Sequence, residues 1–564
     1  MSGKSTSFEV QVLKDKNWVV ETISTDETQA KEFADNLLQT TNHAAVRVVR
    51  DFQRIDGLHT ETVIHEKKAT EKGDKDLSLA AISEAPTCVE LAEFYALPAR
   101  LTIGRLLRKY LDEVVVTQTE LLHNAAELKR LGDKDRLLFS AVDKVSSLQA
   151  RATGEDGKVR SNYLHKSWEE ILTRARTAAP KKPPGKTSLA ELIEAAPGDG
   201  DEKRYNCLVL VALRLLETRA WFGKLETLLG WAAEEASTGE IAQDLIDGIV
   251  ADIVVSAEVI QDLLGFQPNL GAALSHICDL AAGQASAAKF APAWFDDFNK
   301  LFASGRLPDA QQVLLSRVCR EMRGANPLSR NEPEKEFEAF NSLLVRIVDR
   351  GGMVGGPAMA DALYQRYVRF FNGGGSPGQA IEAILTALGD TCRKTQFLLE
   401  FAASPAGTAL GKKPIDTLAG LIRGAKHIDA WVPIRGVLPR DRMAALTAAN
   451  RSLVSARVLT AELRTELADI ADGVMARYLE DEGVIEKIDK PEDPLALRAI
   501  RLVKFCGSGV LIEGKSLAMA RSRVIGHLRQ PNFEEKFLAS VADPVQAEKH
   551  LREFHKLLVE SGFR

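Results

Sequence analysis

The sequence lacks closely spaced cysteines. Its six cysteines lie dozens of residues apart and form no CxxC pair, which excludes a zinc ribbon and a dithiol redox motif. Isolated cysteines in apolar segments are typical of buried, reduced thiols. We therefore expect free thiols, no bound metal or cofactor, and a reducing compartment. The six are Cys88, Cys207, Cys278, Cys319, Cys392 and Cys506.

Long hydrophobic runs are also missing. The longest apolar stretch, Ile249 to Phe266, is interrupted by three acidic residues, whereas a membrane-spanning helix needs about 20 mostly apolar residues. The polar segment Met1 to Ser7 lacks the apolar stretch that a secretory signal needs. These features predict a cytoplasmic protein that does not bind membranes.

Neither charge sign is in large excess. The chain has 73 Lys and Arg against 78 Asp and Glu, a net charge of -5, so no global field would attract nucleic acid. Two basic series at helical spacing leave nucleic-acid binding as an alternative, but aromatic residues are not interleaved with them. Nucleic acid is therefore not the expected partner. The series are Arg100, Arg105, Arg108 and Lys109, and Arg317, Arg320 and Arg323.

Residues 1–66 have the pattern of a small α+β domain. Phe8, Val10 and Val12 alternate with polar residues, and a second alternating run follows around Trp18, as in a β-hairpin. Apolar residues from Ala30 to Leu38 then recur at helical spacing. Two further strand-like runs, at 44–50 and 60–65, complete the predicted order ββαββ.

The rest of the chain has helical patterns almost throughout. Residues 67–87 are charged and weakly periodic, which predicts a linker. We then expect one helical domain at 88–330 and a second at 331–564, in an irregular bundle or solenoid-like array. Capping-box spacing predicts helix starts at Thr117, Ser167, Ser188 and Asn532, each followed three residues later by glutamate. The fold class is mostly α.

The glycine-rich loops between Gly351 and Gly378 are the strongest candidate site. Gly355 and Gly356 precede a predicted helix, and a helix N-terminus can hold an anion through its free N–H groups and dipole. Arg366 and Arg369 lie further along this helix and would add positive charge if the fold brought them back. Glycines also permit close helix packing or a hinge, which is the reading we prefer.

Other groups of polar residues do not converge on a known type of site. His59, Glu61 and His65 would share one strand face, but the two histidines would be about 20 Å apart, too far for one metal. His276 and Cys278 lack any metal-ligand spacing. Three acidic residues on one apolar helix are candidates for acid–base work, with a solvated helix face as the preferred reading. They are Asp244, Asp247 and Asp252.

These observations favour a non-catalytic protein. The chain has no nucleophile motif in the required strand–turn–helix setting and no cofactor fingerprint, although a site assembled from distant residues would leave no such trace. We expect a scaffold, adaptor or regulator that acts through protein–protein contacts. The first alternative is a sensor or enzyme with an anion or nucleotide site at Gly351 to Gly378. The second is a nucleic-acid binder that uses the basic helix faces.

Overall fold

The computed structural model confirms a mostly helical chain. It describes residues 6–14, 17–40, 45–53, 59–68, 78–181, 185, 188–234, 239–288, 291–539 and 544–563. Twenty-nine α-helices lie in these ranges, together with one four-stranded sheet near the start of the chain and one two-stranded hairpin. Among the described helices, none combines the length and the hydropathy needed to cross a bilayer.

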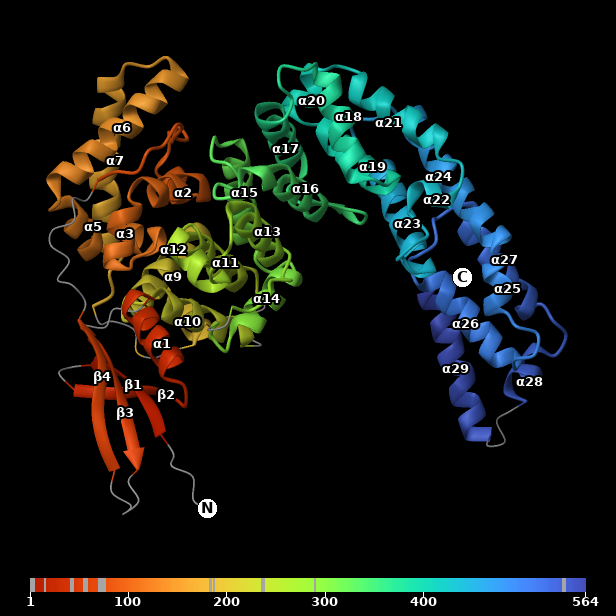
Figure 1. Ribbon diagram of the computed structural model, residues 1–564, viewed down its shortest axis with the longest axis horizontal. Coiled ribbons are helices and arrows are strands. Elements are labelled where there is room, and N and C mark those ends of the chain that lie inside the picture. Colours follow the sequence, from red (N-terminus) through yellow and green to blue (C-terminus); the bar gives the residue numbers. More distant parts are fainter. Residues whose placement is uncertain are drawn as a thin grey trace. The chain divides into compact units, whose positions relative to one another are not determined.

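The small N-terminal domain has the predicted order ββαββ. Its strands are β1 (Thr6–Lys14), β2 (Asn17–Ser24), β3 (Ala45–Gln53) and β4 (His59–Lys68), and α1 (Glu27–Thr40) lies between β2 and β3 in the chain. All neighbouring strands are antiparallel, in the spatial order β2-β1-β3-β4. Figure 1 shows α1 against one face of this sheet.

The core of this domain follows from the alternation of the strands. Successive side chains of a strand point to opposite faces, so Val10 and Val12 of β1 and Val46 and Val48 of β3 reach the same side of the sheet. Ala30 and Ala34 of α1 complete the buried cluster. Small alanines let the helix backbone approach the valine surface closely.

The chain divides into two compact units. Unit 1 comprises Met1–Phe266 and Asp279–Leu314, and unit 2 comprises Gln267–Cys278 and Leu315–Arg564, so the division falls within α13 (Leu270–Ala281) and α15 (Pro308–Arg323). Besides the N-terminal domain, unit 1 contains the 3-10 helix η1 (Leu91–Tyr95) and the helices α2 (Leu97–Leu106), α3 (Arg108–Val114), α4 (Gln118–His123), α5 (Ala125–Gly132), α6 (Asp135–Thr153), α7 (Gly157–Ala178), α8 (Leu189–Ala195), α9 (Gly200–Leu215), α10 (Trp221–Ala233), α11 (Glu240–Val254), α12 (Ala257–Leu264) and α14 (Phe295–Ala303).

Unit 2 is built from helices that pack mainly on neighbours close in sequence, such as α17 on α18 and α19, and α26 on α27. Its hairpin pairs β5 (Val348–Asp349) with β6 (Gly352–Met353). The short 3-10 helix η3 (Pro333–Lys335) precedes α16. The α-helices are α16 (Glu336–Ile347), α17 (Gly356–Phe370), α18 (Pro377–Leu388), α19 (Thr391–Ala402), α20 (Pro405–Ala409), α21 (Lys413–Gly424), α22 (Ile428–Trp431), α23 (Pro439–Ser455), α24 (Ala461–Asp481), α25 (Val484–Ile488), α26 (Leu495–Gly507), α27 (Lys515–Leu528), α28 (Phe533–Leu538) and α29 (Pro544–Glu560).

Three of the four predicted capping positions begin helices, although Asn532 at the start of α28 makes no side-chain cap hydrogen bond. Thr117 and Glu120 cap α4 reciprocally, with the Thr117 hydroxyl accepting from the Glu120 N–H at 3.0 Å, and Ser188 with Glu191 does the same for α8. The prediction at Ser167 is wrong, because this residue lies inside α7 and its hydroxyl donates to the Tyr163 carbonyl at 3.0 Å. Serine can sit in a helix interior when it bonds one turn back in this way.

Candidate functional site

The candidate glycines at the start of α17 have a clear structural use. Gly355 and Gly356 have φ angles of 78° and 56°, in the left-handed region that glycine adopts without strain. A Cβ atom added to Gly356 would lie 3.5 Å from a carboxylate oxygen of Glu400. This helix start therefore already faces an acidic side chain, which does not favour a bound anion.

The two candidate arginines are held elsewhere in unit 2. Arg366 is fully buried and donates to a Glu336 carboxylate oxygen at 2.9 Å and to the Asn326 carbonyl at 2.7 Å. Arg369 donates to the Arg323 carbonyl at the end of α15. The structure thus does not bring either arginine to Gly355 and Gly356.

The histidine candidates are likewise dispersed. His65 pairs with Asp35 at 2.7 Å, and the side chains of His59 and Glu61 lie outside the described residues. A ring nitrogen of His276 lies 3.2 Å from the Gln267 amide nitrogen. Among the residues that the structure describes, no group of three His, Cys, Asp or Glu side chains is placed to hold a metal ion.

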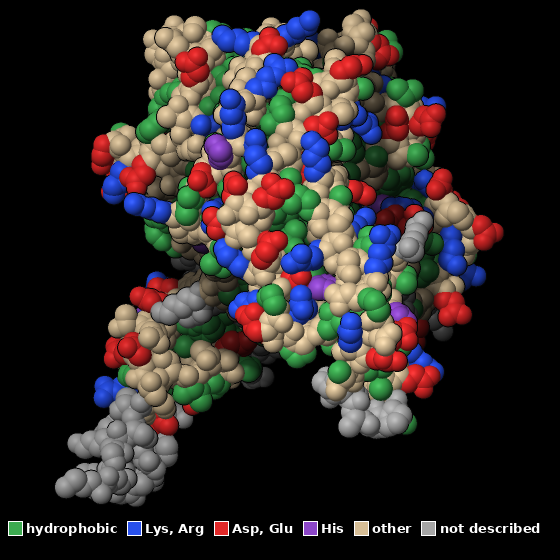
Figure 2. Space-filling model, turned by 90° about the vertical axis from the view of Figure 1, so that its right-hand side faces the viewer, with side chains coloured by type: hydrophobic (Ala, Val, Ile, Leu, Met, Phe, Trp, Pro, Cys, Tyr) green, Lys and Arg blue, Asp and Glu red, His purple; other side chains and the backbone are tan. Residues whose placement is uncertain are grey.

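Several residues of the two basic series are engaged in contacts within the fold. Arg108 bonds Asp112 one turn along its helix, Lys109 donates to the Ser78 hydroxyl, and Arg323 pairs with Asp361 at 3.1 Å. On the face drawn in Figure 2, basic and acidic side chains are interspersed. This mixture does not favour the single-signed surface that a nucleic-acid backbone requires.

A polar pocket in unit 1 combines the features of a binding site. It has a volume of about 250 Å³ and lies among η1, α2, α4, α7, α9 and α11. Its wall contains an aromatic group, in which the rings of Tyr95, His123 and Tyr205 lie 4.9 to 5.4 Å apart between centroids. Three arginines and two aspartates also line it: Arg100, Arg174, Arg204, Asp201 and Asp244.

His123 is the most informative residue of the pocket. Its side chain is almost fully buried, and its Nδ1 lies 2.7 Å from the Thr119 carbonyl. Because a carbonyl can only accept, Nδ1 carries the proton of the neutral ring and Nε2 is left as an acceptor. Nε2 has no hydrogen-bond partner among the described residues. Burial lowers the pKa of His123 to about 3, so the ring is neutral at physiological pH.

The wall beside His123 is fixed by a buried ion pair. Asp252 of α11 accepts from the Thr119 N–H at 2.8 Å and from the Thr119 hydroxyl at 2.6 Å. Its other oxygen accepts from Arg100 at 3.0 Å, and the same Arg100 nitrogen contacts the Gly248 carbonyl at 2.9 Å. These contacts join α2, α4 and α11, so the imidazole of His123 is carried by a rigid frame.

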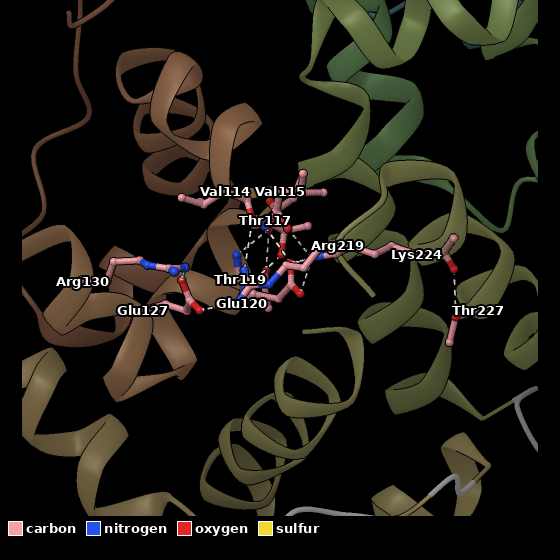
Figure 3. Close-up of polar contacts among 12 residues, drawn as sticks. Val114, Val115, Thr117, Thr119, Glu120, Glu127, Arg130, Arg219, Lys224 and Thr227 are labelled. Carbon is pink, nitrogen blue, oxygen red and sulfur yellow. Dashed lines mark hydrogen bonds and ion pairs between the residues drawn. The ribbon is translucent and has the colours of Figure 1, made fainter. Parts of the chain in front are cut away.

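A second buried ion pair stabilises the turn between α3 and α4 (Figure 3). Lys224 and Glu120 are both fully buried, and the ammonium group lies 2.6 Å from a carboxylate oxygen. Lys224 also donates to the Val115 carbonyl at 2.7 Å. Val115 has a φ of 51°, which is strained for a β-branched residue. The ammonium group therefore stabilises the strained turn that places Thr117 as the cap of α4.

The arginines of the pocket are each matched by a carboxylate. Arg100 pairs with Asp252 at 3.0 Å, Arg174 with Glu202 at 3.1 Å and Arg204 with Asp244 at 2.7 Å. The Arg174 guanidinium also lies over the Tyr205 ring, 3.8 Å from its centroid, a cation–π contact. Since Asp201 adds one more negative charge, the pocket does not present the excess positive charge that a nucleotide or polyanion would need.

The titratable groups of the pocket hold fixed protonation states near neutral pH. A general base works best when its pKa lies near the operating pH, and His123 lies far below it. Burial raises the pKa values of Tyr95 and Tyr205, so both hydroxyls keep their protons and can donate. The Thr119 hydroxyl, which also lines the pocket, donates to Asp252.

The sequence had indicated two residues of this site, but as candidates for acid–base catalysis. Asp244 and Asp252 stood out as acidic residues on an apolar helix, but they form no catalytic pair: one bonds Arg204 and the other Thr119 and Arg100. Asp247 accepts from the N–H groups of Asp309 and Ala310 at the start of α15. Tyr95, His123, Arg174 and Tyr205 were missed, because no short motif connects them.

Comparisons of this chain with models of known protein families, with curated proteins and with solved structures gave no match.

Proposed function

We propose that this chain is a non-catalytic, cytoplasmic regulatory protein that binds a small polar molecule in the pocket of unit 1. The observation that carries the proposal is the buried Nε2 of His123, an acceptor without a partner among the residues that the structure describes. A buried polar atom in this state costs free energy unless something donates to it. A ligand with an N–H or O–H group would remove that cost.

The matched charges of the pocket define the ligand class. With each arginine already paired to a carboxylate and Asp201 adding a further negative charge, the site disfavours an anion, and we propose a neutral or zwitterionic molecule. Such a molecule needs a donor for His123 and acceptors for the hydroxyls of Tyr95 and Tyr205. Amino acids, amides and nucleosides have this combination of groups.

The cytoplasmic location is proposed from the state of the thiols. All six cysteines are free and buried, and burial raises the pKa of Cys88, Cys319 and Cys506 to about 11. Unreactive, unpaired thiols are typical of proteins from reducing compartments.

Protein–protein contacts are the second part of the proposal, as in a scaffold or adaptor. β2 is at one edge of the N-terminal sheet and exposes Val19, Val20 and Ile23. An edge strand with apolar side chains can accept a strand of a partner. The test is recovery of partners from the native cell with the wild type and with Ile23→Lys. A partner lost only in the variant supports this role, and a partner set unchanged by the substitution contradicts it.

Ligand binding can be tested by thermal shift with matched pairs of compounds. Glutamine and adenosine would be compared with glutamate and adenosine monophosphate, within a wider panel of amino acids, amides and nucleosides. We expect at least one uncharged member to raise the apparent melting temperature by a few degrees near saturation. Its charged counterpart should raise it less.

The test variant is His123→Phe, which keeps an aromatic ring but removes the acceptor. The matched control is His427→Phe, at an exposed position of unit 2. The shift should disappear in the first and persist in the second. A panel without any shift, or a shift given by phosphate compounds alone, would overturn the proposal. The latter result would favour the anion-site alternative.

A further inference from the structure

Unit 1 contains a second cavity, on the other side of α2 and α4 from the polar pocket. Its volume is about 130 Å³. Leu121 and Leu122 of α4 line this cavity, whereas Thr119 and His123 of the same helix line the polar pocket. Helices α6 and α7 supply the opposite wall, including Ala141 and Trp168.

The lining of this cavity is almost entirely aliphatic or aromatic. Its two polar side chains with oxygen atoms, Thr102 and Gln149, are already engaged: the Thr102 hydroxyl donates to the Pro98 carbonyl at 3.0 Å, and Gln149 bonds both Arg160 and the Pro86 carbonyl. A buried water needs two to four polar partners. The cavity therefore favours an apolar occupant over water.

One side of the cavity is closed by the segment 85–90, which we term the strap. Three side chains of the α6–α7 hairpin hold the strap through its carbonyl groups: Gln149 donates to Pro86, Arg160 to Cys88 and Tyr163 to Val89. Gln149 and Arg160 are buried. These hydrogen bonds hold the strap in place as one wall of the cavity.

We propose that this cavity is a binding site for an uncharged hydrocarbon group of about the size of benzene, either an aromatic ring or a short alkyl chain. Its size is comparable to that of engineered apolar cavities of roughly 150 Å³, which stay dry and bind benzene or xenon. Burial of the ligand's apolar surface supplies the driving force. The proposal does not depend on ligand binding in the polar pocket.

The test uses the full-length protein with benzene, 1-hexanol and hexanoate as probes. We expect a saturable rise in melting temperature with benzene or 1-hexanol, and a change in tryptophan fluorescence that is lost in Trp168→Phe. Benzene acting alone identifies a ring as the preferred group, and 1-hexanol acting alone identifies a chain. Hexanoate carries a charge that the cavity cannot solvate, so it should act more weakly than 1-hexanol.

Ala141→Leu fills the cavity and should abolish both signals, and Ala99→Leu does the same from α2 if the first variant does not fold. His123→Phe, which alters only the polar pocket, should keep them. The inference is overturned if neither benzene nor 1-hexanol gives a signal, if the signals survive in both filled variants, or if hexanoate acts more strongly than 1-hexanol.

Discussion

His123 has an environment that opposes its protonation in the folded state. The ring is buried, and the nearby guanidinium groups of Arg100 and Arg174 add to the effect of burial. A neutral imidazole with one nitrogen bonded to the backbone is an acceptor of fixed direction. This property is useful for recognising a donor and of little use for proton transfer near neutral pH.

The pH dependence of stability follows from the same shift. Below pH 6.5 the unfolded chain takes up a proton at His123, whereas the folded chain, with a pKa of about 3, does not. The free energy of unfolding therefore falls as the pH falls from 6.5 towards 3, by about 1.4 kcal/mol per pH unit. Between pH 7.5 and pH 5, the wild type should lose about 2 kcal/mol more than His123→Gln. Urea denaturation at the two pH values measures this difference, and equal losses would contradict a neutral, buried His123.

The pair of Lys224 and Glu120 gives a second prediction for single residues. Lys224→Met leaves the Glu120 carboxyl group buried without its partner, and should lower the free energy of unfolding by about 3 to 5 kcal/mol. The double variant Lys224→Met/Glu120→Gln should recover part of that loss. Lys300→Met, which removes the exposed pair with Asp297, is the control and should have no measurable effect. If Lys224→Met is as mild as the control, the buried pair does not hold the turn at Val115.

Secondary-structure elements could be predicted where residues close together in the sequence form a recognisable pattern. The alternation around Val10 and the helical spacing after Ala30 predicted the strands and the helix of the N-terminal domain. The Thr117 capping box predicted the start of α4. These patterns depend on residues within a few positions of one another. The stretch 348–353 gave no such signal, and the short β5–β6 hairpin within it was not predicted.

The polar pocket could not be predicted in this way. Its lining comes from six elements between Ala92 and Ile249, and their juxtaposition depends on long-range packing. One indirect signal was present: a carboxylate such as Asp252 on an otherwise apolar helix needs a buried partner. The sequence could not identify Arg100 and Thr119 as those partners, because they precede Asp252 by 152 and 133 residues.

The start of α17 provides a test at the level of one element. Gly355→Ala and Gly356→Ala force a side chain into a left-handed conformation, so each should lower the free energy of unfolding by about 1 kcal/mol or more. Gly420→Ala in α21 is the control, because open space surrounds it and alanine favours a helix. Phosphate should not stabilise any of these proteins. A phosphate-dependent thermal shift that is lost in Gly356→Ala would restore the anion site that we first considered there.

Across the whole molecule, the thiols should report the integrity of both units. Cys88 and Cys207 lie in unit 1, and the other four cysteines, Cys278, Cys319, Cys392 and Cys506, lie in unit 2. All six cysteines are buried and free, so a thiol reagent should label the native protein slowly and the denatured protein at six positions. Rapid labelling of native Cys207 or Cys392 would contradict the packing of the unit concerned, and fewer than six reactive thiols after denaturation without reductant would reveal disulfides.

Measuring the protonation state of the His123 ring tests the proposed function most directly. This measurement does not require the ligand to be known. In ¹⁵N NMR spectra of protein labelled at histidine, the resonances of His123 can be assigned by their loss in His123→Gln. We expect a neutral ring protonated at Nδ1 from pH 7.5 down to pH 5. A ring that is charged at pH 6, or protonated at Nε2 at pH 7.5, would contradict the free acceptor on which the proposed function rests.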